Sequence, residues 1–210
     1  MADQFQNFAE LSAAYTEGTQ FRVTYAKNSP DVAAIAIHGG GIEVGSTELL
    51  EAVKAYRPTW SWYSFEALLS SNNSVLHLTS THFDDPRAID TVTYVDRVIS
   101  LHGASGDEPK TLIGGLDVVT KDLIRKALEK RGFVVEEATT ESGIAGQEPD
   151  NIANRSKIGG VQLEMTTKQR AMFFVNEDTT KSWRTNPDNW SQYMFDYRDA
   201  IYEGVAQAQA

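Results

Sequence analysis

Short apolar runs alternate with amphipathic helical patterns along almost the whole chain. Helical patterns cover residues 46–57, 86–97 and 119–132, and two more begin near residues 167 and 190. Runs typical of strands cover 21–27, 32–38, 60–68, 75–80, 98–103, 111–117, 133–139 and 161–166. Because strand-like and helical segments alternate along the chain, the order predicts an α/β three-layer sandwich with a central mixed, largely parallel sheet. Ligands of such sheets bind outside the carboxyl ends of the strands.

No repeat, low-complexity tract or long linker interrupts this pattern, so we expect one domain over residues 1–210. No apolar stretch approaches the ~20 residues of a membrane-spanning helix, so we expect no membrane partner. The start, MADQFQNFAELSAAY, lacks the basic and apolar regions of a secretory signal. We therefore expect a protein that is made in the cytoplasm without a signal peptide and leaves only by lysis or another signal-independent route. We also expect a monomer.

The chain contains no cysteine and carries a net charge of −10, from 19 basic and 29 acidic residues. The absence of cysteine excludes disulfides, thiolate zinc sites and cysteine nucleophiles. A tightly held metal would need carboxylate and histidine ligands, and the histidines are His38, His77, His82 and His102. An acidic chain without a basic run disfavours nucleic acid as a partner, and a polyanionic substrate would need a local basic patch.

The segment AIAIHGGGIEVGSTEL, residues 34–49, runs from an apolar strand through His38 and three glycines to Glu43. A phosphate cradle, an oxyanion hole and a metal site are all compatible with this order. The phosphate cradle is disfavoured, because GGGIEVG does not match GxGxxG and no GxxxxGK[ST] occurs. The oxyanion hole is disfavoured because the chain lacks the GxSxG turn that carries the nucleophile in such enzymes.

A metal site is favoured by the positions of two histidines. His38 and His102 each end an apolar run and are each followed directly by glycine. Glu43 follows His38 by five residues, across glycines that permit sharp bends. Two histidines and one carboxylate, with one position open, form a recurrent catalytic zinc set. Each histidine alone also fits a hydrogen-bonded core or loop residue.

A hydrolytic metal site also needs a base, and Glu164 is the candidate. It lies late in VQLEMT, residues 161–166, on the same face as Gln162. A glutamate there is costly to bury unless it is paired or functional, and a solvent-facing carboxylate on an edge strand is the alternative. Polar and basic residues bracket it in sequence, namely Asn154, Arg155, Lys157, Lys168 and Arg170. They would supply the basic patch that a polyanion needs, or form a solvated loop and helix face.

Two other histidines fit a metal site less well. His82, in THFDDPR, fits an alternative ligand or a substrate contact, but it also fits a polar turn before Pro86. His77 alternates with two leucines in the expected strand 75–80, which indicates a structural residue.

Five segments in series, HGGGIEVGSTEL, VISLHGASG, IGGLD, IANR and GGVQLEMT, resemble the poly-γ-glutamate hydrolase family of bacteriophages and bacilli. The resemblance covers nearly the whole chain, from near residue 20 to the C-terminal helix. The family is similar in site and fold to zinc carboxypeptidases. The resemblance implies an α/β fold with a mixed sheet, one zinc ion, and cleavage of γ-glutamyl amide bonds in poly-γ-glutamate, which would degrade a capsule.

By position, the resemblance implies that His38, Glu43 and His102 are the zinc ligands and that Glu164 is the catalytic base. The pair Asn154 and Arg155 resembles the carboxylate-binding pair of carboxypeptidases. Those peptidases usually space the first histidine and glutamate three apart rather than five, so the role of Glu43 rests on the hydrolase family itself.

The sequence also permits other interpretations of the site and its function. Lys168 and Arg170 are expected to contact substrate on grounds of charge alone. A carboxypeptidase or an N-acyl amino acid amidohydrolase acting on small substrates would share the mechanism. A non-catalytic domain that binds a polyanion or a metal would use the same side chains.

Overall fold

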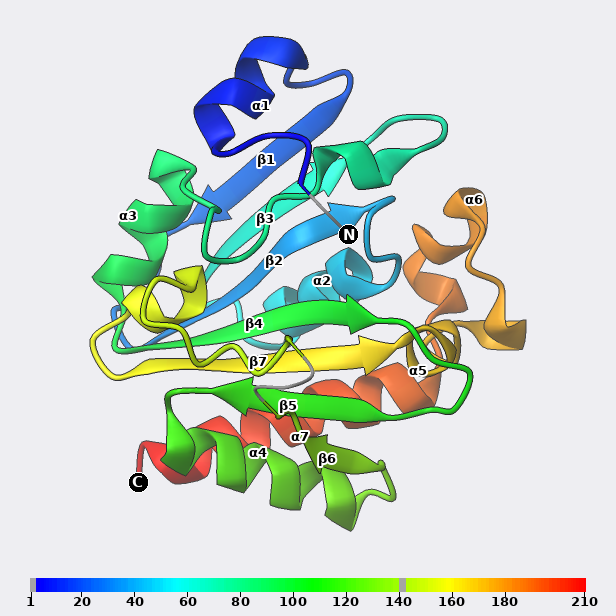
Figure 1. The fold of residues 1–210 in the computed structure, drawn as a ribbon. Coiled ribbons are helices and arrows are strands. Elements are labelled where there is room, and N and C mark those ends of the chain that lie inside the picture. Colours follow the sequence, from blue (N-terminus) through cyan, green and yellow to red (C-terminus); the bar gives the residue numbers. More distant parts are fainter. Residues whose placement is uncertain (1–2, 140–142) are drawn as a thin grey trace.

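The computed structural model describes residues 3–139 and 143–210 (Figure 1). Over these residues, seven strands form one sheet in the order β1-β3-β2-β4-β7-β5-β6. The strands are β1 (Phe21–Ala26), β2 (Val32–Gly40), β3 (Ser61–Ala67), β4 (Arg97–Ala104), β5 (Thr111–Gly115), β6 (Val135–Glu137) and β7 (Gly159–Thr166).

The sheet is mixed but largely parallel. Strand β2 pairs in parallel with β3 and β4, β4 pairs in parallel with β7, and β5 pairs in parallel with β6. Antiparallel pairing joins β1 to β3 and β5 to β7. The carboxyl ends of β2, β4 and β7 therefore meet at one edge of the sheet, where their arrowheads lie together in Figure 1. The expected fold class is confirmed.

Helices cover both faces of the sheet. The α-helices are α1 (Phe8–Ala14), α2 (Ser46–Tyr56), α3 (Pro86–Tyr94), α4 (Val118–Lys130), α5 (Thr167–Ala171), α6 (Lys181–Arg184) and α7 (Gln192–Ala208). Short 3-10 turns are η1 (Asn73–Leu76), η3 (Ile152–Arg155), η4 (Val175–Glu177) and η5 (Pro187–Asn189). Over the described residues, no helix combines the length and the hydrophobicity that crossing a bilayer requires.

Strand β2 shows how one sheet separates two cores. Alternate side chains of β2 point to opposite faces, and every residue of the strand is buried. Val32, Ala34 and Ala36 pack in the core that contains buried residues of α2, α4 and α7. Ala33, Ile35 and Ile37 pack in the core that contains residues of α1 and α3. A continuous apolar run is therefore required, as is usual for a parallel strand covered on both faces.

Two expected elements differ from the structure. Residues 75–80, expected as a strand, form the end of η1 and an irregular segment. Leu76 and Leu78 are buried in the core that contains residues of α1 and α3, so this segment packs on a face of the sheet instead of pairing with a strand. The helix expected over 86–97 ends at Tyr94, because β4 begins at Arg97.

Gly204 allows α7 to lie close to α4. A Cβ on this residue would be 2.5 Å from Ile124 N and 2.6 Å from Ile124 Cα, and backbone atoms cannot rotate away. We expect Gly204→Ala to lower the free energy of unfolding by about 1–3 kcal/mol through overpacking. Alanine otherwise favours a helix by about 1 kcal/mol over glycine, so the sign of the effect is informative. Denaturant titration measures it, and a variant of equal or higher stability would contradict this close approach.

Candidate metal centre

His38 lies near the carboxyl end of β2, where the pairing of the strand is irregular. The register between β2 and β3 shifts between Ala36 and Gly39, and such bulges change the direction of side chains. Gly39 is necessary here, since a Cβ would collide with the Thr47 hydroxyl and lie 2.6 Å from the Phe65 carbonyl oxygen. The first glycine after His38 thus lets helix α2 and strand β3 approach the end of β2.

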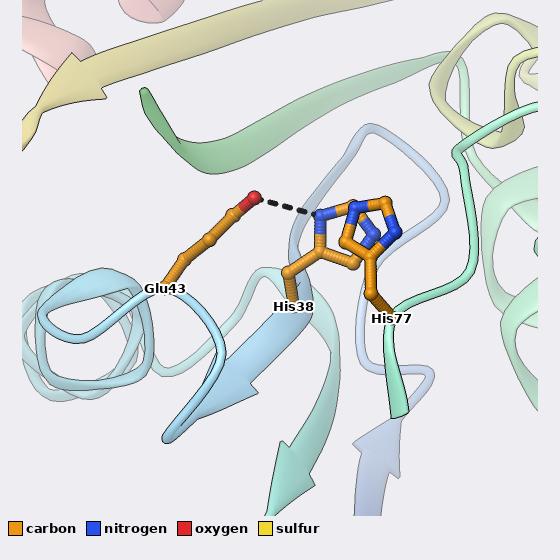
Figure 2. Close-up of side chains that lie close together, drawn as sticks. All are labelled: His38, Glu43 and His77. Atoms are coloured by element: carbon orange, nitrogen blue, oxygen red, sulfur yellow. Dashed lines mark hydrogen bonds and ion pairs between the residues drawn. The ribbon is translucent and has the colours of Figure 1, made fainter. Parts of the chain in front are cut away.

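The loop after these glycines brings Glu43 back to His38. The Glu43 N–H donates to the His38 carbonyl at 2.9 Å, and Gly40 has a φ of 68° that favours glycine. The Glu43 Oε1 atom lies 3.0 Å from His38 Nδ1. Figure 2 marks this contact with a dashed line. The five-residue spacing therefore brings both side chains to a common point.

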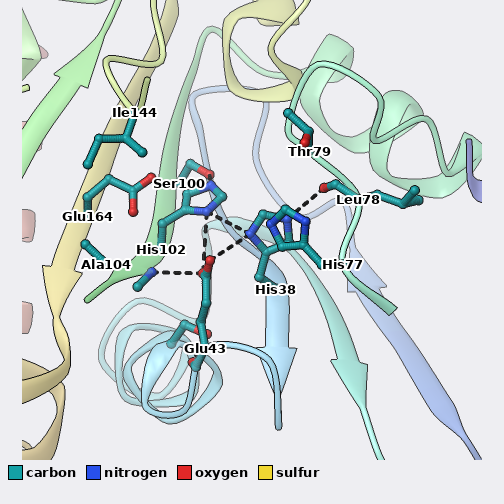
Figure 3. Close-up of polar contacts among 12 residues, drawn as sticks. His38, Glu43, His77, Leu78, Thr79, Ser100, His102, Ala104, Ile144 and Glu164 are labelled. Atoms are coloured by element: carbon teal, nitrogen blue, oxygen red, sulfur yellow. Dashed lines mark hydrogen bonds and ion pairs between the residues drawn. The ribbon is translucent and has the colours of Figure 1, made fainter. Parts of the chain in front are cut away.

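His102, on the neighbouring strand β4, reaches the same point (Figure 3). Its Nδ1 lies 3.1 Å from His38 Nδ1 and 3.5 Å from Glu43 Oε2. Ligand atoms placed about 2.0–2.1 Å from a tetrahedral zinc are about 3.3 Å apart. The spacing of these three side chains therefore matches the ligands of one ion.

The other nitrogen of each ring has its own protein partner. His38 Nε2 donates to the Leu78 carbonyl at 2.8 Å, and the Ser100 hydroxyl lies 2.9 Å from His102 Nε2. Because a carbonyl only accepts, neutral His38 directs the lone pair of Nδ1 toward His102 and Glu43. These buried electron-rich atoms repel one another unless a proton or a cation lies between them. The donor set therefore fits a metal ion, and the outer partners orient the rings.

Charges in the cluster favour a cation at this point. Burial alone would raise the pKa of Glu43, but His38 and His102 hold that pKa well below its usual value. Burial alone would lower the pKa of His102, but the negative charges of Glu164 and Glu43 outweigh it and raise the pKa. Positive charge is thus stabilised beside Glu43.

His77 offers a different third ligand. One ligand atom each from His38, Glu43 and His77 lie within 4.8 Å of one another. The His77 ring lies against the His38 ring, with centroids 4.1 Å apart and planes at 30° (Figure 2). Its Nδ1 lies 2.7 Å from Asp3 Oδ1. His102 Nδ1 lies 3.1 Å from His38 Nδ1, and this closer spacing favours His102 as the third ligand.

The placement of His77 differs from the sequence expectation. It lies in a loop and lines the pocket beside His38, whereas a structural position within a strand was expected. No sequence pattern links it to Asp3, 74 residues away. The His82 side chain is half exposed and lies 3.5 Å from the same Asp3 carboxylate, and His82 is not among the described residues that line the pocket.

Glu164 lies on β7 directly opposite His102 in the sheet register (Figure 3). It is buried on an interior strand, so the alternative of a solvent-facing edge residue is wrong. Burial raises the pKa of Glu164, and the charge of Glu43 adds to that effect, while His102 opposes it. A glutamate held in this way has the raised pKa that suits a general base working near neutral pH.

Gln162 and Asn151 orient Glu164. The Gln162 Nε2 donates to Glu164 Oε1 at 2.7 Å, and the Asn151 Nδ2 donates to Gln162 Oε1 at 2.9 Å. Over the described residues, Glu164 Oε2 has no hydrogen-bond partner in the protein. The alternation of side chains along β7 predicts that Gln162 lies on the same face as Glu164. The hydrogen bond from Gln162 to Glu164 is visible only in the structure.

Replacing Gln162 by leucine should therefore slow turnover without emptying the metal site. We expect Gln162→Leu to lower kcat by about 10–100-fold, as for other residues that orient ligands or catalytic groups. Gln169→Leu is the matched control, since Gln169 is buried and its Nε2 bonds Thr111 rather than Glu164. Steady-state kinetics and zinc content, measured for both variants, test this, and an unchanged kcat in Gln162→Leu would contradict it.

A pocket of about 670 Å³ opens onto His38, Glu43, His102 and Glu164. Over the described residues, its lining contains no lysine or arginine. A larger cavity of about 1010 Å³ is lined in part by Gly40, Gly41 and Val44 and by none of these four residues.

Asn154 and Arg155 do not line this pocket over the described residues. The Asn154 side chain accepts from the N–H of Gly160, at the amino end of β7, and donates to the carbonyls of Gly146 and Glu148. Arg155 Nε donates to a backbone carbonyl in the preceding turn. Binding of a substrate carboxylate by this pair stays a prediction.

Lys168 and Arg170 are also absent from the described lining. Lys168 forms an ion pair with Glu177 at 2.6 Å. Arg170 is only 8% exposed and its guanidinium donates to backbone carbonyls, so the structure does not support the expectation that it contacts substrate. The helix that follows β7 turns this side chain under the site rather than into the pocket.

Comparison with known proteins gives consistent matches. The profile of the poly-γ-glutamate hydrolase family matches residues 5–196. The structure of a bacteriophage poly-γ-glutamate hydrolase is 38% identical, with a TM-score of 0.94 and 99% of each chain covered. A zinc-free structure of YNDL is 33% identical, with a TM-score of 0.89 and 100% of each chain covered. YndL of Bacillus subtilis is 43% identical over 175 residues, which are 82% of this chain and 67% of YndL.

Proposed function

The chain belongs to the poly-γ-glutamate hydrolase family, and from this premise we propose that it is a zinc-dependent enzyme that cleaves the γ-glutamyl amide bonds of poly-γ-glutamate. The observation that carries the proposal is the convergence of His38 Nδ1, His102 Nδ1 and the Glu43 carboxylate, within 3.0–3.5 Å, beside the buried Glu164. The zinc-free form of the related YNDL structure also supports zinc as the metal. Such cleavage would depolymerise a capsule made of this polymer.

His38, Glu43 and His102 would hold one ion. Bound there, zinc would act as a Lewis acid that polarises the scissile carbonyl and lowers the pKa of a water molecule. The hydrogen bonds from His38 to Leu78 and between His102 and Ser100 keep both Nδ1 atoms directed to the same point. The protein thus supplies a rigid set of three ligands and leaves the pocket side open.

Glu164 would move the protons. Gln162 holds its Oε1, so Oε2 is the atom that accepts a proton from the attacking water. The same carboxyl then donates that proton to the amine of the leaving glutamyl unit as the amide C–N bond breaks. One water is consumed for each bond cleaved, giving one new γ-carboxylate and one new amine.

Metal removal and replacement test the function. The protein is treated with a chelator, dialysed, and incubated with poly-γ-glutamate before and after one equivalent of zinc is added. We expect no cleavage by the metal-free protein and restored cleavage with zinc, followed as new amine groups. Absence of new amines at every zinc level would contradict the proposal, and binding of the polymer without cleavage would indicate a non-catalytic domain. Release of single glutamates only would indicate a carboxypeptidase-like exo-enzyme.

A further inference from the structure

Arg170 connects three segments that carry the candidate metal centre. Its Nε donates to the Met165 carbonyl at 3.0 Å, its Nη1 to the Val44 carbonyl at 2.6 Å, and its Nη2 to the Ala104 carbonyl at 3.1 Å. The planar guanidinium can make these contacts in fixed directions, whereas a lysine ammonium cannot reproduce the fork.

Each of these carbonyls lies within two residues of a proposed ligand or of the proposed base. Val44 follows Glu43, Met165 follows Glu164, and Ala104 is two residues beyond His102. The three segments are the loop between β2 and α2, the end of β4 and the end of β7. One side chain therefore links the backbones that carry two of the proposed ligands and the proposed base.

The positive charge of Arg170 also interacts with the carboxylates of Glu43 and Glu164. Over the described residues, no carboxylate is hydrogen-bonded to the guanidinium, whose partners are backbone carbonyls and, at 3.5 Å, the Thr167 hydroxyl. Burial lowers the pKa of Arg170, and the negative charges of Glu43 and Glu164 oppose that effect. A buried cation without a bonded counter-ion is costly, so the three carbonyl hydrogen bonds and the nearby charges of Glu43 and Glu164 must offset that cost.

The backbone of β4 leaves room for this side chain. A Cβ on Gly103 would lie 2.6 Å from Arg170 Cζ and 2.7 Å from Arg170 Nε. Gly103 directly follows His102, and its N–H donates to Glu43 Oε2 at 2.8 Å. The glycine after His102 is therefore where the guanidinium passes beneath the metal centre.

We propose that Arg170 is a positioning residue that holds the segments carrying Glu43, His102 and Glu164 in the geometry required for metal binding and turnover. The effect on turnover rests on the proposed function, whereas the effect on metal binding does not. Arg170 acts through the backbone and touches neither metal nor substrate.

The test compares Arg170→Lys with Arg97→Lys. Arg97 is largely buried and pairs with Asp117, at the amino end of β4 and away from the site. We expect Arg170→Lys to weaken zinc affinity by about 10–100-fold, measured by competition with a chromophoric chelator, and to lower kcat at saturating zinc more than it changes KM. Arg97→Lys should leave both quantities near those of the unchanged protein.

Gly103→Ala is a second variant that keeps the arginine and its charge but displaces the guanidinium. We expect Gly103→Ala to weaken zinc affinity, as Arg170→Lys does. Its thermal stability should be close to that of Arg97→Lys. The inference would be overturned if Arg170→Lys and Gly103→Ala bound zinc as tightly as the unchanged protein. It would also be overturned if the losses of zinc affinity in all three variants merely followed their losses of thermal stability. An unchanged protein that binds zinc but does not cleave poly-γ-glutamate would contradict the proposed function and leave this inference standing.

Discussion

Replacing Glu164 by glutamine should remove most turnover while zinc stays bound. Glutamine has nearly the same shape but cannot accept the proton of the attacking water, and a general base contributes about 10²–10⁴-fold to a rate. We therefore expect kcat on poly-γ-glutamate to fall by about that factor. Zinc content should remain near one ion per chain, because the proposed ligands are His38, Glu43 and His102.

Glu148→Gln is the matched control for this prediction. Glu148 also lines the pocket, but Glu164 is the carboxylate that lies opposite His102 in the register of β4 and β7. We expect the control to keep kcat within a few-fold of the unchanged protein. A Glu164→Gln variant with most of its activity, at full zinc content, would show that another group acts as the base.

Replacing His102 by alanine should release the metal, whereas replacing His77 should not. His102 Nδ1 lies 3.1 Å from His38 Nδ1, whereas the His77 ring lies against the His38 ring at an angle of 30°. Loss of a residue that only orients a ligand costs about 10–100-fold in metal affinity, so loss of a ligand should exceed that range. For His77→Ala we expect a change below about 10-fold.

Equilibrium dialysis against buffered zinc measures both affinities. His82→Ala is the surface control, since half of that side chain is exposed. Equal losses in His102→Ala and His77→Ala would mean that both rings bind the ion. A larger loss in His77→Ala would assign the third ligand to His77 and contradict the geometry that favours His102.

The main elements of the site could be predicted because they depend on local pattern and strand direction. His38, His102 and Glu164 each lie late in an apolar run, and parallel strands bring their carboxyl ends to one edge of a sheet. The convergence of these side chains followed from that rule. The position of Glu43 beside His38 depends on the hydrogen bond between the Glu43 N–H and the His38 carbonyl. The five-residue spacing allows this bond but does not predict it.

Arg170 shows why charge and proximity in sequence are insufficient. A basic residue six positions after Glu164 fits a substrate contact, but the direction of its side chain depends on how the chain leaves β7. Burial against backbone carbonyls of three segments is a tertiary feature without a local signal. The pairing of Asp3 with His77 is unpredictable for the same reason.

Residues 75–80 illustrate the limit of alternation as a signal. Leu76, His77 and Leu78 alternate as a strand would, and both leucines are buried. Both leucines pack in the core on the α1 and α3 face of the sheet, so the segment covers the sheet without pairing with a strand. Whether a buried segment pairs with a strand or covers a face depends on tertiary packing, which is not visible in a short window of sequence.

The molar mass of poly-γ-glutamate during incubation with the zinc-loaded protein tests the central claim most directly. Size-exclusion chromatography with light scattering follows the polymer over time, with Glu164→Gln as the control. The account predicts a progressive fall in molar mass with the unchanged protein and almost none with Glu164→Gln. A polymer of constant molar mass in the presence of the fully zinc-loaded protein would contradict it.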